Sequence, residues 1–419
     1  MHVMIAGGGI GGLVAALSLH QAGIEVTVYE AAQELKPMGV GINILPHAAR
    51  ELIELGLEQD IDAFAIRTSA MNYYTASGQL VISQPCGTSA GYHWPQWSLH
   101  RGDLHMLLLR AFKERAGAGK VITDAALASF QQDDSGVDAT FTQRSKGRPK
   151  TARGDVLIGA DGLHSQTRRI LYPQEGDPMY CGMVLYRAAA EAPAYLDGKT
   201  MIIVGDKRLR LVAYPMSSAL QRDGKGRALI NWIGVLPMDQ DAAPEENWDQ
   251  QSHEQKLTQR YKEWTFDWID VPQILGASDQ IFEFPVYDRD PIERWTFGRV
   301  ALLGDAAHPL IPVSSSGAVQ AILDGRALAY ALATQPDAPS GLKAYEADRL
   351  PTANATVRSS RENGPDEVLE IVHQRCPPGT TDVHAHVPLS ELQTVIDTFK
   401  ERTGFGVETL NARHSYSLT

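Results

Sequence analysis

Apolar positions near the N-terminus fall into two short runs with a longer apolar stretch between them. Residues 3–6 form the first run, an apolar stretch of helical length reaches Gln21, and a β-branched run ends at Glu30. A short apolar run bounded by glycines is typical of a buried strand, and the longer stretch is typical of a helix packed on the sheet. Residues 2–30 are therefore predicted to form a strand, a turn, a helix and a second strand.

The same pattern returns twice further along the chain. Residues 156–158 form an apolar run that enters a glycine-containing turn, with a helix expected after it. Residues 300–303 form another, followed by a loop with two prolines and by a helix predicted to begin near Ser316 as its N-cap. The candidate buried positions of this last helix are Ala318, Ile322, Leu323 and Leu328.

Between about residues 181 and 237 the pattern changes to short strand-like runs separated by turns rich in Gly, Asp and Ser. This spacing predicts an antiparallel sheet that is inserted as a second domain. Residues 71–80 are typical of a hairpin with its turn near Gly78. Residues 143–154 are interpreted as a polar turn region, and residues 247–275 as a polar helical stretch that leads out of the insertion.

The last part of the chain is also predicted to contain a helix. Pro351 and Pro365 are expected to act as breakers before it. Residues 388–405 carry an apolar stripe at helical spacing, which indicates either a structural helix or a dimer contact. The stripe consists of Leu389, Leu392, Val395, Ile396 and Phe399.

Composition excludes several classes of protein. The 419 residues are 43% hydrophobic and 21% charged, as in ordinary globular proteins, and are enough for two or three domains. A net charge of -12 without a basic block argues against nucleic acid or an anionic membrane as a partner. No run reaches the roughly 18 apolar residues of a membrane span, and the start lacks the pattern of a signal peptide. The three separated cysteines indicate free thiols in a reducing cytoplasm and no metal site.

The first predicted turn carries Gly7, Gly9 and Gly12 in G-x-G-x-x-G spacing. The first glycine permits a tight turn, the second lets the backbone approach a pyrophosphate, and the third lets the helix pack close to the sheet. Glu30 follows at the distance where a carboxylate binds an adenosine ribose. A glycine-rich turn without a ligand is the alternative, but the flanking strands favour a dinucleotide, either FAD or NAD.

Other stretches also carry residues suited to a ligand. Residues 39–41 read Gly-Val-Gly and indicate either a loop that approaches a ligand or a plain connection. Arg101 begins an amphipathic helix, where the helix dipole disfavours a cation, so a bound phosphate or a surface salt bridge is expected. The Asp-Gly pair at 161–162 and the Gly-Asp pair at 304–305 follow apolar strands, where α/β sheets bind ligands, although Asp-Gly is also a common turn.

With these three motifs in order, the chain resembles the class A flavoprotein aromatic hydroxylases, the family of 4-hydroxybenzoate and salicylate hydroxylases. It is most similar to the phenazine hydroxylase branch of the pyocyanin pathway, through the segments GVGINI, SLHRGDL, DGKTMI and LVAYPM. The resemblance covers about residues 1–365.

The resemblance implies an α/β fold with a Rossmann-type FAD-binding domain of the GR2 type, an inserted antiparallel β-sheet substrate domain and C-terminal helices. The FAD-binding domain is expected to comprise residues 1–72, 98–178 and 276–365. The substrate domain is expected to comprise residues 73–97 and 179–275, and the C-terminal extension residues 366–419.

The resemblance also implies which residues bind the cofactor. The glycine turn approaches the FAD pyrophosphate, Glu30 binds its ribose, Arg101 contacts the flavin side chain or phosphates, and Leu127 lies against the adenine. Asp305 binds the ribityl chain, and the helix that follows begins beside the flavin ring. The full expected set is Gly7, Gly9, Gly11, Gly12, Glu30, Gly41, Ile42, Arg101, Leu127, Asp161, Gly162, Gly304, Asp305, Pro312, Gly317 and Ala318.

Three residues of the inserted sheet are the candidates for orienting a substrate. Tyr214 is suited to polarise a phenol or accept its proton, and Arg187 is suited to meet a substrate carboxylate. Tyr186 is the third candidate. A purely structural role in the sheet is an equal alternative for each of them.

The activity that the resemblance implies is an FAD-dependent monooxygenase that consumes NADH or NADPH. It would hydroxylate an aromatic or N-heteroaromatic substrate with dioxygen through a flavin hydroperoxide. Ring carboxylates that lose carbon dioxide on hydroxylation are among the expected substrates. A flavin dehydrogenase or reductase of the same fold and a non-catalytic flavin-binding protein are the alternatives. The loop at residues 312–317 reads PVSSSG, with Ser314 where relatives usually have glycine. Both a monomer and a homodimer are consistent with the sequence.

Overall fold

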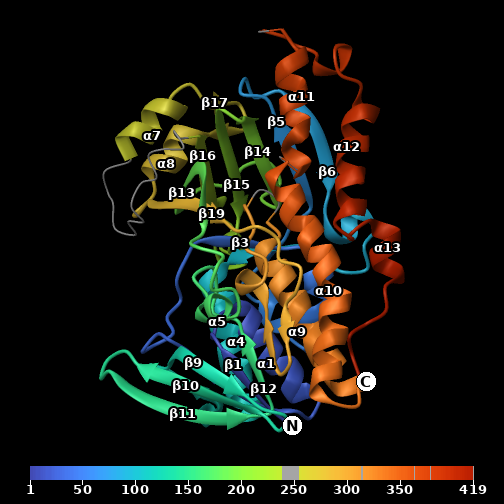
Figure 1. Cartoon of the computed structure of the whole chain (residues 1–419). Helices are drawn as coiled ribbons and strands as arrows, with labels where there is room; N and C mark the ends of the chain where they lie inside the picture. The colour runs from blue at the N-terminus through green and yellow to red at the C-terminus, as the bar shows by residue number, and fades with distance from the viewer. Residues whose placement is uncertain (238–253, 313–314, 363, 378, 419) are drawn as a thin grey trace.

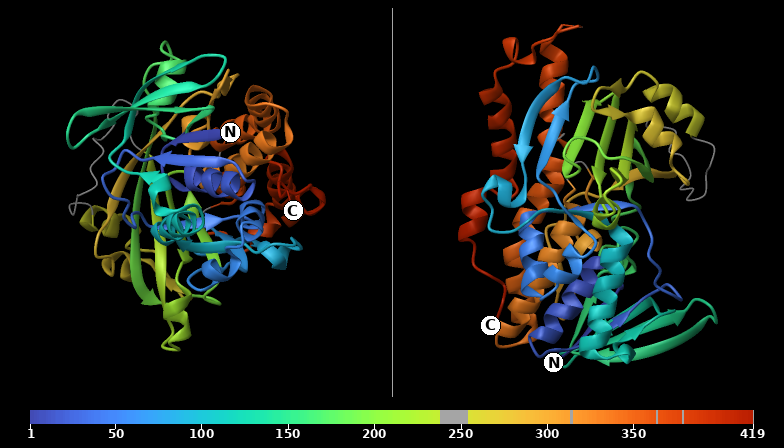
Figure 2. Two further views of the ribbon diagram at one scale, coloured as in Figure 1. Left: turned by 90° about the horizontal axis from the view of Figure 1, so that it is seen from below. Right: turned by 180° about the vertical axis from the view of Figure 1, so that it is seen from behind.

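Two halves built on different sheets make up the molecule (Figure 1). The computed structural model describes residues 1–237, 254–312, 315–362, 364–377 and 379–418. One half surrounds a mostly parallel sheet with helices, and the other is an antiparallel sheet that the chain enters and leaves more than once. The two chain ends lie at the same end of the molecule, on the half with the parallel sheet (Figure 2).

The parallel sheet brings the three predicted strand and helix units together. β1 pairs in parallel with β2 and β12, and β12 pairs in parallel with β21, so the carboxyl ends of β1, β12 and β21 share one edge. The predicted strands are confirmed. In spatial order the sheet consists of β20 (Thr296–Phe297), β21 (Val300–Leu302), β12 (Val156–Gly159), β1 (His2–Ala6), β2 (Glu25–Tyr29) and β8 (Val121–Ile122).

Helices cover this sheet and bury its apolar residues. α1 is buried along most of its length because it lies between the sheet and neighbouring helices. α10 runs without a break through Pro351, so the prediction that this proline ends a helix was wrong. Pro351 and Ala347, four residues earlier, are both exposed, so water can satisfy the carbonyl group that the proline leaves unpaired. The main helices are α1 (Ile10–Gln21), α2 (Pro46–Glu54), α4 (Arg101–Ala116), α5 (Gln166–Leu171), α9 (Gly317–Thr334) and α10 (Ala338–Arg361).

A three-stranded antiparallel sheet extends from this half. It consists of β9 (Ala126–Gln132), β10 (Val137–Gln143) and β11 (Arg148–Gly154), with β11 at one edge. The expected polar turn at residues 143–154 is therefore mostly a strand. The sequence was misleading because the side chains of residues 148–151 are all exposed, so β11 has no apolar alternation along that stretch.

The inserted domain is a seven-stranded sheet, antiparallel except where β14 pairs in parallel with β5. The predicted hairpin with Gly78 in its turn is confirmed by β5 and β6. The sheet extends past the predicted domain boundary at residue 275, because its edge strand β19 follows that position. In spatial order the strands are β19 (Phe282–Asp288), β13 (Met179–Pro193), β16 (Arg227–Pro237), β15 (Leu209–Pro215), β14 (Thr200–Asp206), β5 (Ala70–Tyr74) and β6 (Leu80–Pro85).

One face of this sheet is covered by α7 (Glu254–Tyr261) and α8 (Val271–Gly276) (Figure 1). A short hairpin, β17 (Thr265–Phe266) and β18 (Ile269–Asp270), separates the two helices, so the expected helical stretch at 247–275 is interrupted. Its first residues, 247–253, lie outside the described part. The other face of the sheet is directed toward the parallel-sheet half and the C-terminal helices.

The C-terminal segment folds back over the molecule. α11 (Glu367–Arg375) and α12 (Leu389–Arg402) lie beside the β5 and β6 hairpin (Figure 2). Leu392, Ile396 and Phe399 are buried there, which confirms the structural reading of the apolar stripe for these three residues. After α13 (Val407–Ala412), Arg413 pairs with Glu51 of the first half. Among the described residues, no helix combines the length and the apolarity that crossing a bilayer requires.

Candidate active site

A cavity of about 390 Å³ lies between the two halves, at the shared edge of β1, β12 and β21. Ligands bind at this edge in open α/β sheets because helix N-termini converge there. The structure brings most of the predicted residues to it. Those that line the cavity are Gly9, Gly11, Gly12, Gly41, Ile42, Arg101, Gly162, Arg187, Tyr214, Gly304, Asp305, Pro312, Gly317 and Ala318.

The three motif glycines have different neighbours. A Cβ added to Gly7 would overlap the carbonyl oxygen of Ala160, and one added to Gly12 would overlap that of Gly7. These two positions are therefore glycine because the turn itself is packed tightly. A Cβ on Gly9 would meet no protein atom within 4 Å, so the backbone at the start of α1 is left open to the cavity. The open position fits a phosphate that approaches the helix N-terminus.

Glu30 and Asp161 do not line the cavity but hold loops that do. Glu30 accepts hydrogen bonds from the amides of Gly8 and Ala32, at 2.7 Å each. Asp161 accepts hydrogen bonds from the Thr167 amide at 2.9 Å and from its hydroxyl at 3.0 Å. Their carboxylates therefore order the first and second motif turns.

Leu127 lies away from the cavity. It is buried in an apolar cluster in which Tyr29 and Phe141 stack with ring centroids 3.9 Å apart. Its side chain is directed into this packing between β9, β10 and β2. The cavity lining therefore does not support the adenine contact expected for it.

The third motif forms the floor of the cavity. Asp305 follows β21 and its side chain is exposed to the open cavity, where desolvation by the surrounding protein raises the pKa of its carboxyl group. α9 begins beside it, and the N–H groups of the first turn of a helix have no partner within that helix. Ala318 is only partly buried, in contrast to its predicted burial, because it faces the cavity. Ser314, in the loop at residues 312–317, lies outside the described residues.

A buried network braces this loop from behind. Asp324 accepts hydrogen bonds from the Gly304 amide at 3.0 Å and from Arg349 at 2.9 Å. The His308 ring nitrogen Nε2 lies 2.6 Å from Asp324 Oδ2, the oxygen that also accepts from the Gly304 amide. These residues fix where the Gly-Asp motif lies, and the sequence patterns gave no sign of them.

Arg101 is the cationic residue of the cavity that comes from the parallel-sheet half. No acidic side chain in the described ranges forms an ion pair with it, which leaves the salt-bridge interpretation without support. Its backbone amide donates to the Val40 carbonyl at 2.8 Å, which holds the start of α4 against residues 39–41. An unpaired guanidinium group fits an anionic ligand such as a phosphate.

Residues of the inserted sheet form the roof. Arg187 Nη2 donates to the Gly41 carbonyl at 2.7 Å, and the Gly41 amide donates to Asn231 Oδ1 at 2.7 Å. A Cβ on Gly41 would lie 2.6 Å from Asn231 Cβ and 2.7 Å from Tyr214 Cε2. Gly41 is therefore glycine because the roof is packed directly on its backbone, which joins the two halves.

Burial controls the ionisation of the roof. It raises the pKa of Tyr214 to about 12, although the neighbouring Arg187 opposes the shift. It also lowers the pKa of Arg187, because a charged guanidinium group is costly to desolvate. At neutral pH the Tyr214 hydroxyl therefore keeps its proton and can donate it in a hydrogen bond.

Tyr186 lies on the opposite face of β13, in the apolar cluster that contains Trp232 and Tyr261. Successive side chains of a strand alternate between its faces, so Leu185 and Arg187 reach the cavity and Tyr186 does not. Tyr186 is accordingly dropped from the candidate site.

Asn231 was missed by the sequence interpretation. It is fully buried on β16 and contacts the Gly41 amide across the two halves. The available signal was a polar residue in the apolar run that ends at Pro237, and it gave no indication of the partner. Asn43, two residues after Gly41, also lines the cavity and was also missed.

A dinucleotide cradle roofed by the sheet of an inserted domain defines an oxidoreductase that holds its cofactor between two domains. The open Gly9 backbone, the unpaired Arg101 and the start of α9 fit FAD in particular. A family model described as FAD binding domain matches residues 1–360. The chain belongs to this family.

Two relatives and one solved structure illustrate the similarity. The phenazine 1,6-dicarboxylic acid hydroxylase PhzS of Lysobacter antibioticus is 40% identical over 399 residues, which cover 94% of this chain and 97% of that protein. The 3-hydroxybenzoate 6-hydroxylase of Polaromonas naphthalenivorans is 31% identical and covers 86% of this chain and 87% of its own. Klebsiella pneumoniae HpxO, solved with FAD and uric acid, has the same fold, with a TM-score of 0.75 and 24% identity over 95% of this chain and 96% of that one.

The chain is thus an FAD-dependent monooxygenase that uses NADH or NADPH. The described residues contain no group of three or more His, Cys, Asp or Glu side chains placed to hold a metal ion.

Proposed function

We propose that the protein hydroxylates a planar N-heteroaromatic ring acid related to the phenazine carboxylic acids. The observation that supports this most is the roof of the cavity, in which Tyr214 and Arg187 lie among apolar side chains of the inserted sheet. Such a surface suits a flat ring with few polar groups. The relative that is 40% identical over almost the whole chain acts on a phenazine dicarboxylic acid by its name.

The residues of the roof orient this ring. Tyr214 stays protonated at neutral pH and donates a hydrogen bond to an oxygen or ring nitrogen of the substrate. Arg187, held by the Gly41 carbonyl, places a positive charge beside it. Together they fix which ring carbon faces the cofactor, and a fixed reacting geometry is itself a large contribution to rate.

The floor of the cavity serves the cofactor. FAD, when bound, supplies the electron transfer from NADH or NADPH and the reaction with dioxygen. The N-terminus of α9 and Arg101 stabilise negative charge on the cofactor without having to reorganise. Asp305 offers a carboxyl group to the hydroxyls of the cofactor, and the inserted sheet keeps water from the reacting atoms.

The proposal is tested by reducing the FAD-loaded protein anaerobically with NADH and with NADPH. Phenazine, pyridine, quinoline and benzoate acids are added one at a time, and the reduced protein is then mixed with dioxygen labelled with oxygen-18. A phenazine-type acid is expected to accelerate flavin reduction by at least tenfold and to leave carrying the label.

Two other results would replace the proposal. Rapid reduction without label in any product would identify a flavin dehydrogenase or reductase. Bound flavin that neither nucleotide reduces with any ring compound present would identify a flavin-binding protein without catalysis.

We also infer a reducing compartment, such as the cytoplasm, that supplies NADH or NADPH. The three free thiols, Cys86, Cys181 and Cys376, support this. One chain supplies both the floor and the roof of the cavity, so the chemistry is available to a monomer and to each copy in a homodimer.

A further inference from the structure

A second, smaller cavity of about 40 Å³ adjoins the main one. The two share Leu185, Ile233, Pro312 and Ser315 in their walls. Its volume suits a small substituent of a ring rather than the ring itself. Apolar side chains form most of its wall, namely Met183, Leu185, Met201, Ile203, Val212, Ile233, Val235 and Pro312.

One ion pair interrupts this apolar wall. Arg210 of β15 and Asp366, just before α11, both line the small cavity, and they are only 6% and 3% exposed. Arg210 Nη1 donates to Asp366 Oδ2. Arg210 Nε and Asp366 Oδ1 are buried without a hydrogen-bond partner among the described residues. A buried donor and a buried acceptor left unused side by side are costly to a fold, which suggests that a ligand satisfies them.

The surroundings of Asp366 strengthen this argument. Asp366 occupies the N-cap position of α11, where an aspartate normally accepts a hydrogen bond from the helix backbone, but its side chain makes no such bond. It is turned toward Arg210 instead. Burial raises the pKa of Asp366, and Glu370 adds to the effect while Arg210 opposes it. The carboxyl group is therefore suited to share a proton with a second acid.

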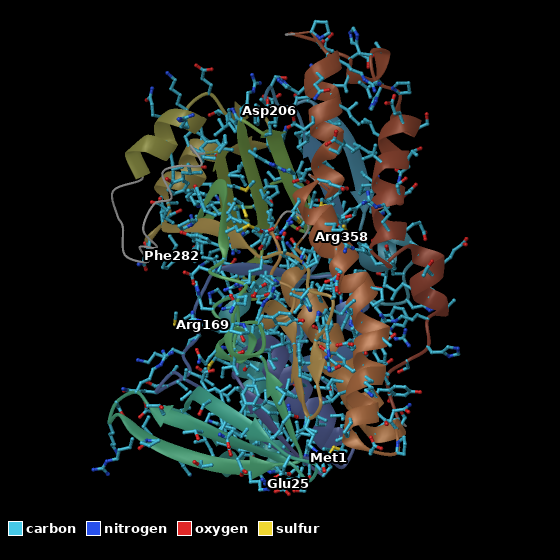
Figure 3. The ribbon with its side chains drawn as sticks, in the orientation of Figure 1. Met1, Glu25, Arg169, Asp206, Phe282 and Arg358 are labelled. Carbon is cyan, nitrogen blue, oxygen red and sulfur yellow. The ribbon has the colours of Figure 1, made fainter. Side chains whose placement is uncertain are left out.

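The position of Arg210 on the sheet sets its distance from Tyr214. Arg210, Val212 and Tyr214 share one face of β15, so Arg210 lies about 13 Å from Tyr214 along the strand. β15 starts at the outer end of the sheet, where Asp206 is labelled in Figure 3, and runs toward the parallel-sheet half. The pair is thus at the end of the chamber farther from the cofactor cradle.

We propose that Arg210 and Asp366 bind a carboxyl substituent of the ring substrate. Arg210 Nε donates to one carboxyl oxygen, and the other carboxyl oxygen shares a single proton with Asp366 Oδ1. The ring lies in the main cavity, and its carboxyl group enters the small one. This inference rests on the proposed function. It assigns the selection of ring acids to Arg210 and Asp366 and not to Arg187.

The test compares two ligands that differ only in this group, phenazine-1-carboxylic acid and 1-methylphenazine. Their dissociation constants are measured with the FAD-loaded protein from the change in flavin absorbance. The unaltered protein is expected to bind the acid at least tenfold more tightly. In the double variant Arg210→Met with Asp366→Leu this preference is expected to fall below threefold.

Matched variants separate recognition from damage to the fold. Replacing both members of a buried ion pair by apolar residues of similar volume is usually tolerated. Arg210→Gln is a milder change, expected to lower the preference at least fivefold, and Asp366→Asn is expected to keep or increase it because Arg210 then carries the only charge. The control is Arg227→Met with Glu191→Leu, an exposed pair of the same sheet joined at 2.7 Å, which is expected to leave the preference unchanged.

Each contrary outcome has its own meaning. If the Arg210 variants keep their FAD and the full preference for the acid, the inference is overturned. If the unaltered protein hydroxylates ring compounds but does not prefer the acid, the inference fails and the proposed function stands. If the protein binds neither ligand and no ring acid is hydroxylated, both fail.

Discussion

Gly9 and Gly12, three residues apart in the first motif, give opposite expectations for the same substitution by alanine. Gly12→Ala places a Cβ against the Gly7 carbonyl oxygen, so it is expected to lower the free energy of unfolding of the FAD-free protein by about 3 kcal/mol. Gly9→Ala meets no protein atom and is expected to cost about 1 kcal/mol or less. It should nevertheless weaken FAD binding at least tenfold, because the added methyl group occupies the phosphate approach. Urea unfolding and FAD titration measure the two effects.

A Gly9→Ala protein that binds FAD as tightly as the unaltered protein would show that the open backbone at α1 is not the phosphate position. Equal losses of stability in the two variants would show that the turn, rather than the ligand, requires both glycines.

Tyr214 is expected to act as a neutral hydrogen-bond donor. Its pKa of about 12 means that it does not lose its proton between pH 6 and 9, so it should give no inflection in the rate of hydroxylation over that range. Tyr214→Phe is expected to lower kcat/KM about tenfold, as the loss of one hydrogen bond to a buried group does. Steady-state rates across the pH range measure both. An inflection near pH 9 that disappears in the Tyr214→Phe variant would identify Tyr214 as a base instead.

Among individual residues, the sequence predicted those whose role depends on neighbours close in the chain. The glycines of the first motif and Asp305 follow from a strand, a turn and a helix that are continuous in sequence. Asn231 and His308 could not be found in this way, since their roles depend on partners in other elements, Gly41 and Asp324. Tyr186 was expected to orient the substrate, but the alternation of β13 directs Arg187 toward the cavity and Tyr186 toward the opposite face of the sheet.

Among the elements, α2 contacts the C-terminal segment through a histidine whose protonation affects stability. His47 of α2 stacks on Phe405 with ring centroids 5.2 Å apart, and burial lowers its pKa to about 3, with Arg413 and Arg349 adding to the shift. In the unfolded chain its pKa is near 6.5. Below pH 6.5 the unfolded state therefore binds more protons, and stability is lost as pH falls.

The expected loss from His47 is about 1.4 kcal/mol for each pH unit below 6.5, and none above it. Urea unfolding at pH 7.5, 6.5 and 5.5 measures this slope. His47→Phe, which keeps a stacked ring without a titrating group, is expected to remove that part of the slope. Identical pH dependence in the two proteins would mean that other groups account for it.

The strands with a clear hydrophobic pattern were predicted, and those without one were not. The strands β1, β12 and β21 are buried on both faces and stand out as apolar runs, whereas β11 is exposed and was taken for a turn. The placement of β19 in the inserted sheet depends on its pairing with β13, about 100 residues earlier, which no local pattern reveals.

In the whole molecule, the cofactor cradle is shared by both halves, so FAD should stabilise them together. At a free FAD concentration 100 times its dissociation constant, the expected gain is about 2.7 kcal/mol. Scanning calorimetry should show a single transition that moves upward as a whole, since Arg187 and Asn231 attach the roof to Gly41. A transition that splits, with one part unaffected by FAD, would mean that the inserted sheet unfolds independently.

The overall architecture followed from the sequence, but the way the chain closes on itself did not. Alternating α/β patterns and an antiparallel insertion are visible in one dimension. The pairing of Arg210 with Asp366, 156 residues later, and the return of Arg413 to Glu51 are not, because each depends on how separate units are packed.

The exposed strand β11 has a consequence for the behaviour of the protein in concentrated solution. It lies at the edge of its sheet, where unpaired backbone groups can recruit a strand from another molecule and start aggregation. Pro149 has no backbone N–H to donate to an added strand, and Lys150 adds a charge that must be desolvated on contact. Pro149→Val with Lys150→Val is therefore expected to produce oligomers at concentrations where the unaltered protein sediments as one species. The polar character that concealed this strand in the sequence is also what protects it from sticking to its neighbours.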